Sequence, residues 1–168
     1  MISALRRLAP LLVLLATACA GKGPPGPQHA SFPAGQRVTR SDELVLELSE
    51  ARYDLQEVAL TVSLTNEGPG SLKLDRQGVL LAYGELEFPV AEGPAAEGFA
   101  TLDEQTALAP GEMQLKLRFV IEQPLLEAGT LHLISIRRDD DSWLAPLRLA
   151  VPPPAAFVDA VEPEGDAG

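Results

Sequence analysis

The stretch "MQLKLRFVI", residues 113–121, decides the fold class, because its side chains alternate between apolar and polar over almost its whole length. One set is apolar and comprises Met113, Leu115, Leu117, Phe119 and Ile121, while the other comprises Gln114, Lys116, Arg118 and Val120. An extended strand turns successive side chains to opposite faces, so a period of two predicts a β-strand with one buried face.

The same period occurs in "EVALTVSLTNEG", residues 57–68, where Asn66, Glu67 and Gly68 end the run as a turn. Its apolar set is Val58, Leu60, Val62 and Leu64. Further strands are predicted at 44–48, 71–74, 79–83, 86–90, 130–136 and 143–151, with Gly84 and Glu85 closing a tight hairpin. For residues 41–55 a strand is favoured, and a short helix capped by Ser41 is the alternative.

About seven to eight strands in one core-sized segment predict an all-β fold, a single antiparallel β-sandwich over residues 41–152. Two sheets can bury their apolar faces against each other in this arrangement. We expect Phe88, Phe119, Trp143 and the leucines to supply the core.

Three segments resemble the immunoglobulin-like domains found in secreted bacterial proteins and lipoproteins. They are "VSLTNEGPGSLKL" (62–74), "GVLLAYGELEFPV" (78–90) and "LAPGEMQLKLRFVI" (108–121). The matching positions are Asn66 and Gly68 in one turn, Leu108, Pro110, Gly111 and Glu112 in the next, and Phe119 at the strand end. The resemblance implies an immunoglobulin-like sandwich that acts as a binding or assembly module, without catalytic residues or a cofactor.

The N-terminal residues 1–18 are predicted to be a signal peptide. Met1 to Arg7 is positively charged, residues 8–16 are apolar apart from Pro10, and small residues follow. The apolar run is shorter than the roughly 20 residues that a membrane-spanning helix needs.

The sequence "LATAC", residues 15–19, resembles the lipobox of bacterial lipoproteins, although Ala16 stands where leucine is preferred. The resemblance implies cleavage between Ala18 and Cys19, with N-palmitoyl and S-diacylglycerol groups on Cys19. Because position 20 is Ala rather than Asp, it also implies sorting to the outer membrane. Ordinary signal-peptidase cleavage and an uncleaved N-terminal anchor are the alternatives.

Two segments flank the predicted sandwich. Residues 19–40 are rich in Gly and Pro and are predicted to be a tether, since prolines favour extended chain and the apolar residues show no period. Residues 153–168 are acidic and rich in Pro and Ala, which predicts a disordered tail.

The formal charge of −11 argues against nucleic acid as a partner, because a polyanion is repelled by an acidic surface. The expected partners are the membrane, through the lipid anchor, and a protein of the cell envelope.

Residues typical of a reactive site are few. Of the two histidines, His29 lies in the tether and His132 alternates with leucines on a predicted strand, which favours a structural role. A typical zinc site is not expected, because the single cysteine is assigned to lipidation. Asp139, Asp140 and Asp141 follow Arg137 and Arg138. A solvated hairpin turn is favoured for them, and calcium binding is the alternative.

The sequence therefore predicts a lipid-anchored envelope lipoprotein whose sandwich is a non-catalytic binding or structural module. One alternative is a small envelope enzyme or ligand carrier with a pocket in the sandwich. Another is a subunit or assembly factor of an envelope complex that binds partners by strand addition.

Overall fold

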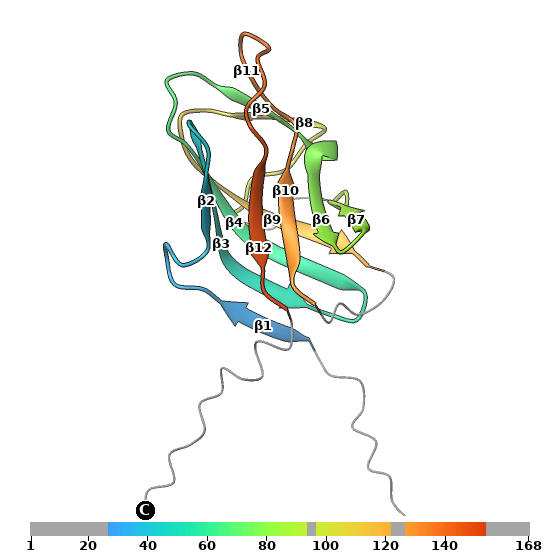
Figure 1. Cartoon of the computed structure of the whole chain (residues 1–168). Coiled ribbons are helices and arrows are strands. Elements are labelled where there is room, and N and C mark those ends of the chain that lie inside the picture. The colour runs from blue at the N-terminus through green and yellow to red at the C-terminus, as the bar shows by residue number, and fades with distance from the viewer. Residues whose placement is uncertain (1–26, 94–96, 122–126, 154–168) are drawn as a thin grey trace, which may run out of the picture.

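Twelve strands and one short 3₁₀ turn make up the part of the chain that the computed structural model describes, residues 27–93, 97–121 and 127–153 (Figure 1). The strands are β1 Gln28–Ser31, β2 Val38–Arg40, β3 Leu44–Tyr53, β4 Glu57–Asn66, β5 Leu72–Asp75, β6 Val79–Tyr83, β7 Leu86–Pro89, β8 Gln105–Leu108, β9 Gly111–Val120, β10 Gly129–Leu133, β11 Ile136–Arg138 and β12 Leu147–Val151; the 3₁₀ turn is η1 Arg76–Gly78. All pairings between these strands are antiparallel. The predicted all-β antiparallel fold is confirmed.

The largest sheet is built around β4, which pairs with β3 on one side and with β9 on the other. Both β1 and β2 pair with β3: β2 lies along Val45–Glu47, and β1 lies along Glu50–Tyr53. A bulge between Leu48 and Glu50 separates the two pairings. One edge of this sheet is therefore formed by β1 and β2 in line, and the other edge is formed by β9.

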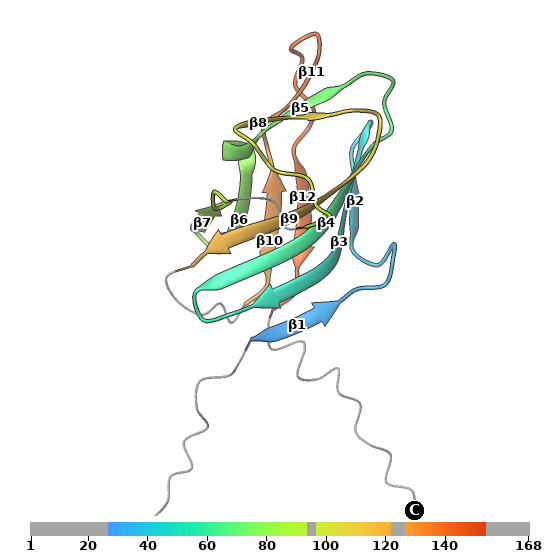
Figure 2. The same cartoon turned by 180° about the vertical axis from the view of Figure 1, so that it is seen from behind.

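A second sheet, in the order β12-β10-β6-β7, faces the first, and Figure 2 shows the two layers one behind the other. The layers also meet at one side, where Val90 forms a bridge with Phe119 of β9. A third, small sheet, β11-β5-β8, lies at one end of the sandwich (Figure 1).

The core lies between the two larger sheets and is filled mostly by leucine and valine. Along β9, Leu115, Leu117 and Phe119 are buried, while Lys116 and Arg118 point to solvent. Val58, Leu60, Val62 and Leu64 of β4 are buried in the same way. The two stretches with a period of two therefore form the strands that the sequence predicts.

Several expected boundaries are wrong. Residues 28–31 and 38–40, which were assigned to the tether, are strands of the large sheet, so the folded domain begins before residue 41. Strand β8 was not expected. The predicted strand at 130–136 is two strands, and the last strand begins at residue 147 rather than 143. Residues 44–53 form a strand, so the helical alternative there is also wrong.

Other predictions concern residues outside the described ranges. These are the signal peptide, cleavage between Ala18 and Cys19, lipidation of Cys19 and the tail beyond residue 153. Within the described ranges, no helix has the length and apolar character needed to cross a membrane.

Two glycines are required by the way the chain turns. Gly84 has a φ of 57° and closes the two-residue turn between Tyr83 and Leu86, which confirms the predicted hairpin. Gly78 lies against the backbone of Ser135, and a Cβ there would be 2.4 Å from the Ser135 Cβ atom and 2.7 Å from its backbone nitrogen. Only glycine allows this approach.

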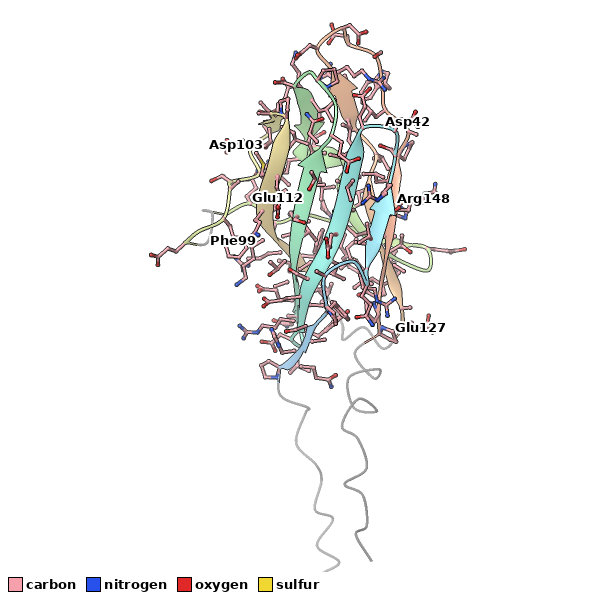
Figure 3. All side chains as sticks on the ribbon, turned by 90° about the vertical axis from the view of Figure 1, so that its left-hand side faces the viewer. Asp42, Phe99, Asp103, Glu112, Glu127 and Arg148 are labelled. Carbon is pink, nitrogen blue, oxygen red and sulfur yellow. The ribbon has the colours of Figure 1, made fainter. Side chains whose placement is uncertain are left out.

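The two ends of the described chain lie at the same end of the sandwich, which we call the base. Gln28 pairs with Tyr53, and the Tyr53 hydroxyl donates a hydrogen bond to the carbonyl of Pro152. The opposite end, which we call the tip, carries β5, β8 and β11 (Figure 1). In Figure 3, Asp103 lies toward the tip and Glu127 toward the base.

Candidate functional site

The three aspartates that were the metal candidates form the turn of a hairpin at the tip. The Arg138 N–H donates to the Ser142 carbonyl (2.8 Å), and the Asp141 N–H donates to the Arg138 carbonyl (3.0 Å). Asp141 has a φ of 61°, a left-handed conformation that aspartate tolerates better than most residues. Asp139, Asp140 and Asp141 therefore occupy a turn with a defined backbone conformation.

Asp140 is held in its ionised form. Its Oδ1 atom accepts hydrogen bonds from the Ser142 Oγ (2.6 Å) and the Ser142 N–H (3.0 Å), and these bonds lower its pKa below the ordinary value for aspartate. A carboxyl group with a lowered pKa is a poor proton donor near neutral pH. The described residues contain no group of three or more His, Cys, Asp or Glu side chains that could hold a metal ion.

The two arginines before the turn lie on opposite sides of the hairpin. The Arg138 Nε atom lies 2.8 Å from the Glu43 Oε1 atom, which joins the hairpin to the start of β3. The Arg137 guanidinium lies 3.6 Å from Asp75 of β5 and 3.9 Å from Asp141. Both arginines are therefore engaged by carboxylates.

Trp143 lies at the surface, so its predicted place in the core is wrong. Its side chain is 60% exposed, and the Arg137 Cζ atom lies 5.3 Å from the centroid of its ring. The residue forms an isolated bridge with Arg137 across the hairpin. No sequence signal marks this location, because a tryptophan directly after a turn can face either the core or solvent.

The outer face of the small sheet continues from this hairpin. Arg137 is opposite Lys73 of β5, and Lys73 is opposite Ala107 of β8. On the same face, Gln105 of β8 donates from its Nε2 atom to the Oδ1 atom of Asp75 (3.1 Å). The other face is apolar and buried, with Leu72, Leu74, Leu108 and Ile136.

A polar groove of about 640 Å³ opens beside this outer face. It is lined by Asp75, Gln77, Asp103, Glu104, Gln105 and Ser135. Three of these six side chains are carboxylates, and Asp75 is also the ion-pair partner of Arg137. The groove and the exposed tryptophan are thus joined through one pair of charged residues.

Asn66, which the sequence analysis identified only as a turn residue, fixes the position of β8. Its side chain is buried, and its Nδ2 atom donates to the carbonyls of Gly70 (2.8 Å) and Leu108 (2.9 Å). Its Oδ1 atom accepts from the Gly68 N–H (2.9 Å). The single side chain therefore ties the turn after β4 to the end of β8.

The histidines do not join this site. His132 lies on β10 of the second sheet, opposite Leu80 on one side and Arg148 on the other. His29 lies on β1 at the base, where its Nε2 atom is 3.9 Å from the Glu50 Oε2 atom and both side chains are about half exposed. The structure places both histidines away from the Asp139–Asp141 turn.

These sheets define an all-β protein with an antiparallel sandwich architecture. A crystal structure of a candidate lipoprotein (ycdA) from Bacillus subtilis is similar, with a TM-score of 0.55 and 12% identity over 73% of this chain. The match covers 41% of the Bacillus protein, so this chain corresponds to less than half of it. A protein of unknown function from Listeria monocytogenes is also similar, with a TM-score of 0.52 and 9% identity over 74% of this chain and 87% of that one.

At these identities the likeness shows the fold alone. No family model matches the sequence, and no curated protein matches it.

Proposed function

We propose that this chain is a lipoprotein of the cell envelope, held at a membrane by lipid on Cys19, and that its immunoglobulin-like sandwich is a non-catalytic module that binds a protein partner. The lipobox resemblance at residues 15–19 supports the anchor. The likeness of the fold to a candidate lipoprotein is compatible with an envelope location.

The observation that carries this proposal is the position of Gln28. This residue begins β1 at the base of the sandwich, only nine residues after Cys19. A fully extended chain of nine residues spans about 30 Å at most. Lipid on Cys19 would therefore keep the base near the bilayer and leave the tip, with Trp143 and the acidic turn, facing away from it.

Two or more acyl chains would make this attachment stable, because each buried methylene group contributes about 0.8 kcal/mol. A protein fixed in this way meets its partners mainly through surfaces that point away from the membrane. The exposed side chains at the tip are in the right place for such contacts.

The proposal is tested by substituting Cys19. In cells fed radiolabelled palmitate, Cys19→Ser should abolish labelling and release the chain from the membrane fraction, because serine lacks the thiol that forms the thioether. Ala20→Asp is the matched control: it should keep the label and change only the membrane in which the protein is found. Unchanged labelling of the Cys19→Ser protein would contradict the proposal.

A further inference from the structure

We propose that the outer face of the β11-β5-β8 sheet is a docking site for an extended segment of a partner protein rich in lysine or arginine, with Trp143 as its aromatic anchor. We call this surface the tip face, and define it by Lys73, Asp75, Gln105, Arg137 and Trp143. The inference rests on the proposed binding role and names the kind of partner.

Trp143 is exposed at the edge of the tip face. It is the only tryptophan of the chain, and at 60% exposure it keeps much of its ring in solvent although the core offers apolar surroundings. An indole buries about 150–250 Å² when it is covered, and tryptophan is enriched among the residues that dominate binding energy. Arg137 lies over the ring, and the rest of the exposed indole is available to a ligand.

The hairpin that presents this ring is held by hydrogen bonds and an ion pair. Hydrogen bonds cross the hairpin between Arg138 and Ser142 and between Ile136 and Leu144. Arg137 is in turn held by Asp75 of the neighbouring strand. A side chain that is already ordered loses little conformational entropy on binding, so the tip face is prepared for a contact.

The polar groove is linked to the ring through the Arg137–Asp75 ion pair. Trp143 contacts Arg137, Arg137 pairs with Asp75, and Asp75 lines the groove. Neighbouring strands lie about 4.8 Å apart, and Trp143 pairs with the outer side of β11, so Trp143 and β8 are about 14 Å apart. Four or five residues of extended chain would cover this distance and reach from the indole into the groove.

The charged residues at the tip determine whether a positively or a negatively charged partner is favoured. Asp103 and Glu104 line the groove, and Asp139 and Asp140 belong to the exposed turn. Arg137 and Arg138 are engaged by Asp75 and Glu43, so of the cations named here only Lys73 of β5 offsets these four additional carboxylates. The excess of negative charge attracts ammonium and guanidinium groups and repels anionic lipid or nucleic acid.

The test uses the lipidated full chain in detergent micelles and the fluorescence of Trp143, which has no competing tryptophan. The probe is an eight-residue peptide that alternates lysine and threonine, and its counterpart alternates glutamate and threonine. The lysine peptide should give a saturable change in emission that weakens as salt is added, and the glutamate peptide should give none. Equal responses to both peptides, or no response to either, would overturn the proposal.

Variants locate the binding. By calorimetry, Trp143→Ala should weaken binding of the lysine peptide about tenfold, and Glu104→Gln should weaken it several-fold. Glu87→Gln, an exposed acid on β7 of another sheet, is the matched control and should leave the affinity unchanged. Equal loss in the Glu104 and Glu87 variants would mean that net charge binds the peptide, and it would refute a site at the tip face.

Two further results separate this proposal from the proposed function. Vesicles containing phosphatidylglycerol should not change the Trp143 emission of the Cys19→Ser protein, and a change larger than that given by the peptide would make the tip face a membrane contact instead. The Cys19→Ser protein should bind the lysine peptide as well as the lipidated protein does. If the wild-type protein is labelled by palmitate but does not bind the lysine peptide, the docking site at the tip face is refuted and the lipid anchor is not.

Discussion

Replacing Asn66 by alanine is the sharpest test of how the tip is held to the rest of the sandwich. The side chain is 3% exposed and makes three hydrogen bonds, to the carbonyls of Gly70 and Leu108 and to the Gly68 N–H. Alanine would leave all three backbone groups without this partner. Because Leu108 ends β8, the damage would also reach the strand that carries the groove residue Gln105.

The size of the effect follows from these bonds. A typical intramolecular hydrogen bond contributes about 1 kcal/mol net, so losing three costs about 3 kcal/mol. Single domains have free energies of unfolding of about 5–15 kcal/mol, so this loss is a large fraction of the total. With a slope of about 2 kcal/mol per molar urea, the unfolding midpoint should fall by about 1.5 M.

Asn66→Asp separates the donors from the acceptor. A carboxylate can still accept from the Gly68 N–H, but it cannot donate to the two carbonyls, so we expect a cost of at least about 2 kcal/mol. Urea unfolding followed by circular dichroism measures both variants. Ser63→Ala, a half-buried position on the same strand, is the control and should cost less than about 1 kcal/mol. A midpoint for Asn66→Ala within error of this control would refute the role assigned to Asn66.

Two other predictions concern close packing and pH. Gly78→Ala should destabilise the domain by at least about 2 kcal/mol in the same assay, because its Cβ would collide with the backbone of Ser135. Gly93→Ala is the control and should be almost neutral, because its Cβ would meet only the Arg118 side chain at 3.7 Å. Equal unfolding midpoints for the two variants would contradict the close approach of Gly78 to Ser135. Burial raises the pKa of Tyr83 to about 12, above the ordinary 10, so its contribution to stability is intact below pH 10 and is lost as the pH rises from 10 to about 12. Between pH 10 and 12 the free energy of unfolding of the wild type should fall by up to about 2.7 kcal/mol more than that of Tyr83→Phe, because phenylalanine has no group to ionise. Equal falls in the two proteins would show that burial does not raise the pKa of Tyr83.

The strands of the central sheet could be predicted because burial imposes a period on them. In β4 and β9 side chains alternate between the core and the solvent side, so apolar and polar residues alternate along the sequence. The turn at Gly84 was predictable for a similar local reason, since a two-residue hairpin needs a positive φ.

The edges and the tip could not be predicted in the same way. Strands β1 and β2 have few apolar residues because each is half covered at the edge of a sheet, so no pattern separates them from a tether. Strand β8 is only four residues long, too short for a period to stand out. These segments are strands because β3 and β5 offer them hydrogen-bonding partners, and that pairing is not a local property of the sequence.

The candidate site shows the same limit. The Asp139–Asp141 turn was evident from its composition, but the sequence did not show that Arg137 would link Trp143 to Asp75 on another strand. A tryptophan between a turn and a strand can face either the core or water. Only the packing of β11 against β5 decides which side it takes.

The central claim is that lipid on Cys19 holds the base of the sandwich at a membrane, and mass spectrometry of the mature protein tests it most directly. The chain extracted from membranes should begin at Cys19 and carry the mass of a diacylglycerol thioether and an amide-linked acyl chain. A mature chain that begins at another residue, or a Cys19 with an unmodified thiol, would contradict the claim.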